Sequence, residues 1–338
     1  MSTIRDVAKK AGVSVGTVSR AFNNYKDINP ETKRRIFAIA EELNYSPNIV
    51  AKSLSSKKKM GIGIILEGLI DGDGKDNITF SILQGAYRVA ATHKVELSLY
   101  AINREIQAQT SLKRFCSERN LAGIIVQGVT TDDIFFEELE HIEIPCVVID
   151  VIGKAGSFCG VMSDNVSAAY EVATYVLNSG HQNPYIIAGS KNAMVTVERT
   201  AGFFEAFKDY GKYLTREHII YADYQEEIAY QKVTELLQKE KPTALICMSD
   251  LMALGAMRAI KDCGFSIPKD ISVTGFDGII LTDYTQPQLT TVKQDFSLIS
   301  EEAAKTLLEL IAGNEVSSTK FIPHKLLIRE SVKKVRKK

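Results

Sequence analysis

A short run near the N-terminus carries side chains suited to reading the edges of DNA bases. From Val15 to Asn23 the side chains are mostly small or hydroxylic, and Arg20 is the one cation. Neither Asp nor Glu occurs between Asp6 and Asp27, so this stretch adds no carboxylate that would repel phosphates. A guanidinium can pair with O6 and N7 of guanine, which discriminates between bases by about 1–3 kcal/mol. We therefore expect Arg20 to contact a base, with a phosphate contact as the alternative.

Three short helices would position this face. The first would begin after Thr3 and end at Gly12, a residue suited to a left-handed turn, and its apolar residues recur at helical spacing. Ser14 would cap a second helix almost at once, so a tight turn joins the two. Asn29 as cap and Pro30 at the first position would start a third helix. This arrangement is typical of the helix-turn-helix bundle, although a small helical subdomain of another kind has the same spacing.

A short segment, residues 48–56, follows these helices and precedes three consecutive lysines. Because helices below about 12 residues barely persist in water, it is either a linker or a helix that orders only against a partner. The charge distribution points to a partner. Residues 1–60 hold 12 Lys and Arg against 5 Asp and Glu, whereas the rest of this electrically neutral chain is acidic. A basic end on an acidic body favours a polyanion-binding module attached to another domain.

From residue 61 onward, apolar runs alternate with amphipathic stretches. The runs show little polar alternation, which is typical of parallel strands covered on both faces. We predict strands at residues 62–66, 95–100, 124–126, 146–149, 185–188, 244–248 and 271–274. We predict helices at residues 78–92, 165–179, 196–210, 225–239 and 250–263. This part is too long for one ordinary doubly wound domain, so we expect two lobes and a ligand site beyond the carboxyl ends of strands.

The sequence favours neither an enzyme nor a metalloprotein. The five cysteines are scattered without paired spacing, and no phosphate-binding loop, nucleophile elbow or zinc-protease motif is present. The glycines at 61 and 63 precede their strand, so they do not form a dinucleotide loop. We expect no cofactor and no metal. Without a signal-like N-terminus or an apolar run of about 18–20 residues, we expect a cytoplasmic protein rather than a secreted solute-binding protein.

The order of motifs resembles the lactose-repressor/galactose-repressor (LacI/GalR) family of bacterial transcription regulators. The run TIRDVAKKAGVSVGTVSR, residues 3–20, carries the match most specifically. The resemblance continues through residues 44–48, 51–54, 163–165, 179–181, 199–203, 249–255, 275–277 and 289–292. It implies a small all-α helix-turn-helix DNA-binding domain followed by an α/β two-lobed domain like that of periplasmic binding proteins, with parallel sheets flanked by helices. It also implies a repressor that binds a pseudopalindromic operator as a homodimer or tetramer.

The resemblance implies three parts. These are a helix-turn-helix domain at 1–46, a hinge helix and linker at 47–60, and an effector-binding and dimerisation domain at 61–338. We expect the N-lobe to span about 61–160 and 291–322, and the C-lobe about 161–290 and 323–338. A small effector would bind between the lobes; sugars or sugar derivatives are the usual class and purines the alternative. The partners implied are double-stranded operator DNA and this effector, in the bacterial cytoplasm and on the nucleoid when operator is bound.

Family positions imply DNA contacts from both the helix-turn-helix and the hinge. Relatives vary at the positions of Val15 and Gly16 to select operators. Neither side chain can hydrogen-bond, so we expect only an apolar contact from Val15 to a thymine methyl. Leu54 matches the leucine that wedges into the minor groove, a contact compatible with packing between two hinges. The expected DNA-binding residues are Thr3, Val15, Gly16, Thr17, Ser19, Arg20, Asn23, Asn29, Thr32, Tyr45, Asn48, Ala51 and Leu54.

In the cleft, the resemblance assigns charge-assisted contacts to Arg199 and Asp277, with a salt bridge between the lobes as the alternative. Ser249 stands where the family usually has Asn, so the effector cannot be inferred from relatives that carry Asn. The expected effector-binding residues are Phe80, Asp164, Arg199, Tyr224, Ser249 and Asp277. The sequence leaves open whether the effector is an inducer or a corepressor, and which operator the protein reads.

Overall fold

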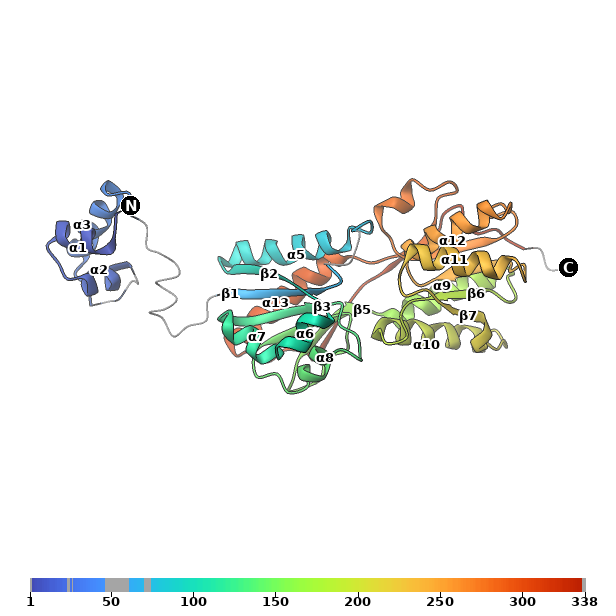
Figure 1. The fold of residues 1–338 in the computed structure, drawn as a ribbon, viewed down its shortest axis with the longest axis horizontal. Coiled ribbons are helices and arrows are strands. Elements are labelled where there is room, and N and C mark those ends of the chain that lie inside the picture. The colour runs from blue at the N-terminus through green and yellow to red at the C-terminus, as the bar shows by residue number, and fades with distance from the viewer. Residues whose placement is uncertain (1, 23–24, 26, 46–60, 70–73, 336–338) are drawn as a thin grey trace. The chain divides into compact units, whose positions relative to one another are not determined.

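The computed structural model describes the chain except for residues 1, 23–24, 26, 46–60, 70–73 and 336–338. The chain forms two compact units, residues 1–60 and 61–338 (Figure 1). Each unit is described by itself below.

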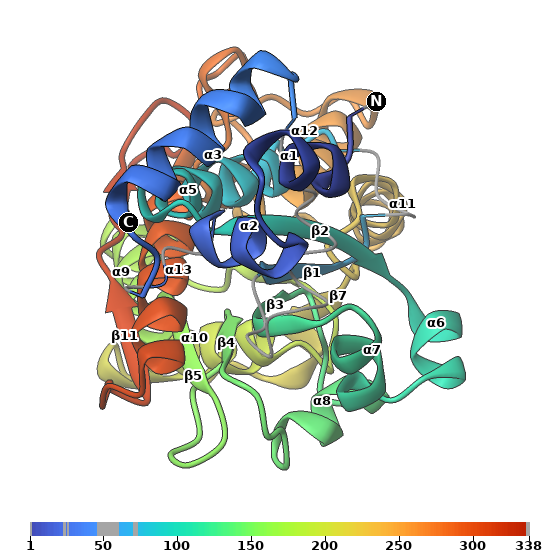
Figure 2. The same cartoon turned by 90° about the vertical axis from the view of Figure 1, so that its left-hand side faces the viewer.

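The first unit contains α1 (Ile4–Ala11), α2 (Val15–Phe22) and α3 (Pro30–Glu42). The predicted caps are confirmed, because Thr3 and Asp6 form a reciprocal capping box and Gly12 adopts φ 65° at the end of α1. Asn29 caps α3 through its side-chain oxygen. The apolar faces of the three helices meet in one core, in which Ile36 is fully buried. Figure 2 shows α1 and α2 together beside the longer α3.

The second unit contains two six-stranded sheets, one in each lobe, ordered β11-β5-β4-β3-β1-β2 and β12-β10-β9-β8-β6-β7. The strands of the N-lobe are β1 (Gly61–Glu67), β2 (Glu96–Ile102), β3 (Leu121–Gln127), β4 (Cys146–Ile149), β5 (Cys159–Ser163) and β11 (Thr319–Ile322). Those of the C-lobe are β6 (Tyr185–Ala188), β7 (Ile219–Tyr221), β8 (Ala244–Cys247), β9 (Ser272–Asp277), β10 (Thr290–Lys293) and β12 (Lys325–Leu327). All neighbours pair in parallel except β10 and β12.

Helices cover the sheets of both lobes (Figure 1). The N-lobe has α5 (Ile78–His93), α6 (Arg104–Gln109), α7 (Leu112–Glu118), α8 (Ile134–Leu139) and α13 (Phe296–Ala312). The C-lobe has α9 (Asn165–Asn178), α10 (Met194–Asp209), α11 (Glu226–Leu237) and α12 (Asp250–Asp262), with 3₁₀ turns at Arg216–His218 and Ile280–Asp283. The close packing of α5 on α13 requires Gly85, because a Cβ there would lie 2.1 Å from the Ser297 carbonyl oxygen.

The predicted two-lobed fold is confirmed, and each predicted strand and helix of this unit is present. The lobe boundaries need a correction of a few residues. Strand β5 keeps the chain in the N-lobe to Ser163, and β10 keeps it in the C-lobe to Lys293. The chain passes between the lobes after β5, after β10 and again between β11 and β12. Across the described residues, no helix is long and apolar enough to cross a membrane.

Candidate functional site

The exposed face of α2 carries the side chains predicted to read DNA. Val15 is 42% exposed, and Gly16 beside it is also exposed. Arg20 forms an ion pair with Asp27, and its guanidinium lies 5.4 Å from the centre of the Tyr25 ring. In this conformation the Asp27 carboxylate therefore pairs with Arg20, the side chain that was expected to pair with a base.

Several other residues predicted to contact DNA form hydrogen bonds at the starts of helices. Thr3 and Asn29 cap helices, and the hydroxyl of Thr17 lies 2.9 Å from the hydroxyl of Ser14, which accepts the Thr17 N–H. Tyr45 packs its ring edge-on against Phe22, and burial raises its pKa. Ser19 and Thr32 are half-buried. Four predicted contacts lie outside the described residues: Asn23, Asn48, Ala51 and Leu54.

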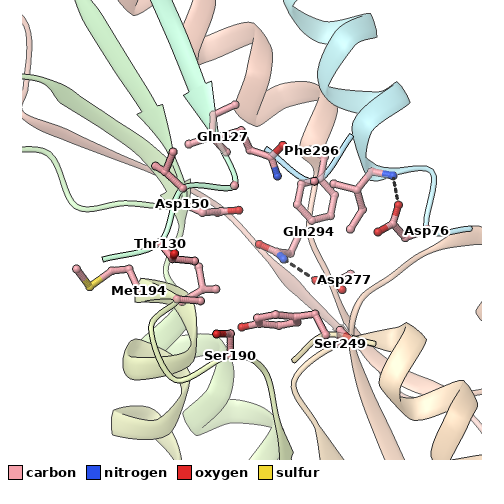
Figure 3. A pocket seen from close by; sticks show the side chains of 18 of the residues that line it. Asp76, Gln127, Thr130, Asp150, Ser190, Met194, Ser249, Asp277, Gln294 and Phe296 are labelled. Carbon is pink, nitrogen blue, oxygen red and sulfur yellow. Dashed lines mark hydrogen bonds between the residues drawn. The ribbon is translucent and has the colours of Figure 1, made fainter. Parts of the chain in front are cut away.

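A pocket of about 420 Å³ lies between the lobes of the second unit (Figure 3). This volume falls in the range of about 300–1,000 Å³ typical of small-molecule sites. Residues that follow β1, β3 and β4 line it from the N-lobe, and residues that end or follow β6, β7, β8 and β9 line it from the C-lobe. The pocket therefore lies at the carboxyl ends of parallel strands, where α/β folds bind ligands.

Arg199, on α10, organises the C-lobe side of the pocket and is only 3% exposed. Its Nε donates to Oδ1 of Asn165 at 2.8 Å, and one terminal nitrogen donates to the Met248 carbonyl. The other terminal nitrogen lies 3.9 Å from Oδ1 of Asp277, and the guanidinium lies 3.7 Å from the centre of the Phe276 ring. Both charged residues belong to the C-lobe, so their ion pair does not bridge the lobes; the interlobe alternative was wrong.

Asp277 ends β9 with its backbone at φ 115°, a conformation that non-glycine residues rarely adopt. The amide of Gln294, on the crossover after β10, donates to Oδ1 of Asp277 at 2.9 Å. Burial raises the pKa of Asp277 well above its ordinary value, against the opposing effect of Arg199. The other end of the Gln294 side chain, Oε1, is buried and has no hydrogen-bond partner among the described residues.

Asp150 approaches the same space from the N-lobe (Figure 3). It follows β4 directly and has φ 63°. Its Oδ1 is buried without a hydrogen-bond partner in the described part of the chain, and burial raises its pKa to about 6. The sequence-based site omitted both Asp150 and Gln294. Each is the first or nearly the first polar residue after a buried strand, a signal that could have located them.

Tyr224 and Ser249 line the pocket as predicted, and both side chains also make contacts with other residues of the C-lobe. The Tyr224 hydroxyl lies 2.7 Å from that of Thr196, and its ring packs so closely on Gly189 that a Cβ there would lie 2.0 Å from the ring. Ser249 caps α12 by accepting the Met252 N–H at 3.2 Å. Accepting this one N–H leaves Ser249 its O–H donor for a ligand.

Phe80 and Asp164 do not line the cleft, which corrects two predicted contacts. Phe80 is 59% exposed because it lies on the side of α5 opposite buried Ile82. It lines a shallow apolar groove between α5 and β2 instead. Asp164 precedes α9 and uses its carboxylate to accept the Ser167 N–H at 3.0 Å, so it serves as a helix cap.

Comparisons with known proteins match both units of the chain. The model for bacterial regulatory proteins of the lacI family matches residues 3–48, and that for a periplasmic binding protein-like domain matches residues 173–332. The probable HTH-type transcriptional repressor ExuR of Bacillus subtilis (strain 168) is 32% identical over 340 residues, which cover 99% of each chain. The chain belongs to the LacI family.

Further LacI-family relatives match along nearly the whole chain. The HTH-type transcriptional repressor PurR of Erwinia tasmaniensis is 31% identical and covers 98% of this chain and 97% of its own. The lac repressor dimer, solved with operator and the anti-inducer ONPF, superposes with a TM-score of 0.83 at 26% identity, covering 98% and 99% of the chains. This LacI-family protein is therefore a DNA-binding transcription regulator with a small-molecule effector. Its relatives are regulators rather than enzymes.

Proposed function

We propose that this protein is a repressor that binds a pseudopalindromic operator as a homodimer and responds to a sugar or sugar derivative in the interlobe cleft. The observation that carries the effector class is the pair of buried acceptors without partners among the described residues, Asp150 Oδ1 and Gln294 Oε1, whose residues line one pocket. Burying a polar atom without a partner is costly, so both oxygens favour a ligand that donates hydrogen bonds. A sugar ring offers several hydroxyl donors in that space.

We assign operator binding to residues 1–46 and a hinge to 47–60, in a protein that works in the bacterial cytoplasm. Arg20 would read a base and Val15 would contact a thymine methyl, while Thr3, Thr17 and Asn29 orient backbone N–H groups toward phosphates. The N–H groups at a helix start that no side chain caps can donate to a phosphate, which favours this role. The proposed hinge contacts, with Leu54 as wedge, would supply the remaining specificity through DNA deformation.

We assign dimerisation to residues 61–338, with the groove between α5 and β2 as one contact face for a second copy. Its lining is apolar and exposed: Phe80 is 59%, Tyr87 66% and Leu99 44% exposed. Strand β2 forms the free edge of its sheet, where an unpartnered apolar surface would otherwise favour aggregation. The lac repressor relative was solved as a dimer. A symmetric dimer would place one helix-turn-helix on each half-site.

The switch would follow from linkage between the cleft and the hinge. A ligand that binds one lobe arrangement more tightly shifts the population toward that arrangement. Ligand and operator then share one coupling free energy, so each changes the affinity of the protein for the other by the same factor. Whether the sugar releases or tightens the operator depends on which arrangement it prefers.

An electrophoretic shift with the DNA upstream of the protein's own gene tests the proposal. We expect a specific complex that weakens steeply with salt. We expect one member of a carbohydrate panel to change its affinity, whereas nucleobases leave it unchanged. Absence of a specific complex would refute operator binding. A response to hypoxanthine or guanine, with none to carbohydrates, would refute the sugar assignment in favour of a purine.

A further inference from the structure

The cleft is rich in carboxylates. Among the described residues that line it, four are acidic: Asp76, Asp150, Asp223 and Asp277. Arg199 is the one cation among them. Lys75 lies in the adjoining groove, where its ammonium pairs with Glu226 of the other lobe at 3.0 Å. Because Asp277 faces Arg199, the excess of carboxylates that a ligand meets here comes from Asp76, Asp150 and Asp223.

Arg199 is partly engaged within the protein. Its Nε and one terminal nitrogen donate to Asn165 and to the Met248 carbonyl, and its other end faces Asp277. One face of the guanidinium is stacked on Phe276. Two of its five N–H donors are thus used internally. An anionic ligand that approached the remaining terminal nitrogen would compete with Asp277 for it.

Two buried acceptors of the cleft lack a hydrogen-bond partner in the part of the chain that the structure describes. Asp150 Oδ1 and Gln294 Oε1 are buried without partners among the described residues. The orientation of the Gln294 amide follows from its neighbour, because Nε2 must face the carboxylate of Asp277, and this leaves Oε1 for the ligand. A hydroxyl group can donate to either oxygen, whereas a carboxylate or phosphate dianion only accepts. Above pH 7, Asp150 is ionised, since its pKa is about 6.

We infer that the cleft takes an uncharged, hydroxyl-rich saccharide and rejects the uronate or phosphorylated form of the same sugar. The inference rests on the proposed function and restricts the ligand class within it. An added anion would lie near several carboxylates in a confined, partly desolvated space, where like charges repel strongly. The hydroxyls that both forms share can still donate to Asp150 and Gln294, so the charge is what separates the two forms.

Calorimetric titration of the full-length protein at pH 7.5 with matched sets of sugars tests this inference. Each set holds one ring configuration as the neutral sugar, the uronate and the 6-phosphate, for glucose, galactose and mannose, with neutral disaccharides added. In any set that binds, we expect the neutral form to bind about 10-fold more tightly or better than either anion. An anion that binds as tightly as its neutral partner, or more tightly, overturns the inference and leaves the proposed function intact. Silence from all carbohydrates overturns both.

A charge-neutral variant separates charge from shape. Asp150→Asn keeps the size of the side chain, and we expect it to narrow the difference in affinity between the neutral sugar and its uronate by about 3-fold or more. Asp164→Asn is the matched control, because Asn also caps helices and Asp164 lies outside the pocket. It should leave the difference unchanged. An equal effect of both variants, or no effect of Asp150→Asn, would contradict the role of the cleft charge.

Discussion

The buried pair of Arg199 and Asp277 gives the most direct test of how the cleft is built. Arg199→Met keeps an unbranched side chain but removes the charge and every donor. The guanidinium nitrogen and the Asp277 Oδ1 are 3.9 Å apart. At an effective dielectric constant of about 20 their attraction is about 4 kcal/mol. Breaking a buried ion pair costs about 3–5 kcal/mol, because the remaining carboxyl must either stay charged without compensation or take up a proton. We therefore expect the free energy of unfolding to fall by about 4 kcal/mol.

A double-mutant cycle isolates the pair from the other contacts of Arg199. Asp277→Asn removes the negative charge, so the combined variant contains no uncompensated ion. We expect a coupling energy of about 2 kcal/mol between the two positions, within the range for contacting buried groups. Arg258→Met serves as control, because the Arg258 side chain is 42% exposed and pairs with Glu226 and Glu227 at the surface. The control should lose less than about 1 kcal/mol.

Urea unfolding of the full chain, followed by tyrosine fluorescence, measures these changes. The protein has no tryptophan, and most of its 13 tyrosines lie after residue 60, so the signal reports mainly on the second unit. If the two single losses add to the double loss within about 0.5 kcal/mol, Arg199 and Asp277 are not coupled and the reasoning is refuted.

Three further predictions concern other parts of the molecule. Asp27→Asn should release Arg20 from its ion pair and raise operator affinity by about 2-fold at low salt in a gel shift; lower affinity would show that Asp27 orients Arg20 productively. Tyr87→Asp should dissociate the proposed dimer in sedimentation experiments, whereas Tyr213→Asp, at a side chain that is 93% exposed, should not; an intact dimer would exclude the α5–β2 groove. Burial raises the pKa of Glu67 from 4.5 to about 8. The folded protein then holds a proton that the unfolded chain releases, and stability falls as the pH rises between those values. Glu67→Gln should therefore gain more stability over the unmodified protein at pH 8.5 than at pH 5 in urea midpoints, and an equal difference at both would contradict the shift.

The helix-turn-helix could be predicted almost residue by residue because its determinants are local. Thr3, Gly12 and Asn29 act within three or four residues of their own positions, and the apolar spacing of each helix directly marks its buried face. The sequence did not indicate that Asp27 would pair with Arg20. That contact joins a helix to a residue seven positions further along the chain, beyond the three- and four-residue spacings of a helix face.

The sequence by itself determined the order of strands and helices, and hence the two-lobed class, because runs of buried strand residues and amphipathic helices are contiguous signals. Only the tertiary structure decided which polar residues share the cleft. Asp150 follows β4 of the N-lobe and Gln294 lies on the crossover after β10, far away in the chain, and sheet order and crossovers bring them to one pocket. The same geometry places Phe80 on the outer face of α5 and leaves Asp164 as a helix cap. A binding site depends on distances across the fold, and residue spacing along a single chain does not specify those distances.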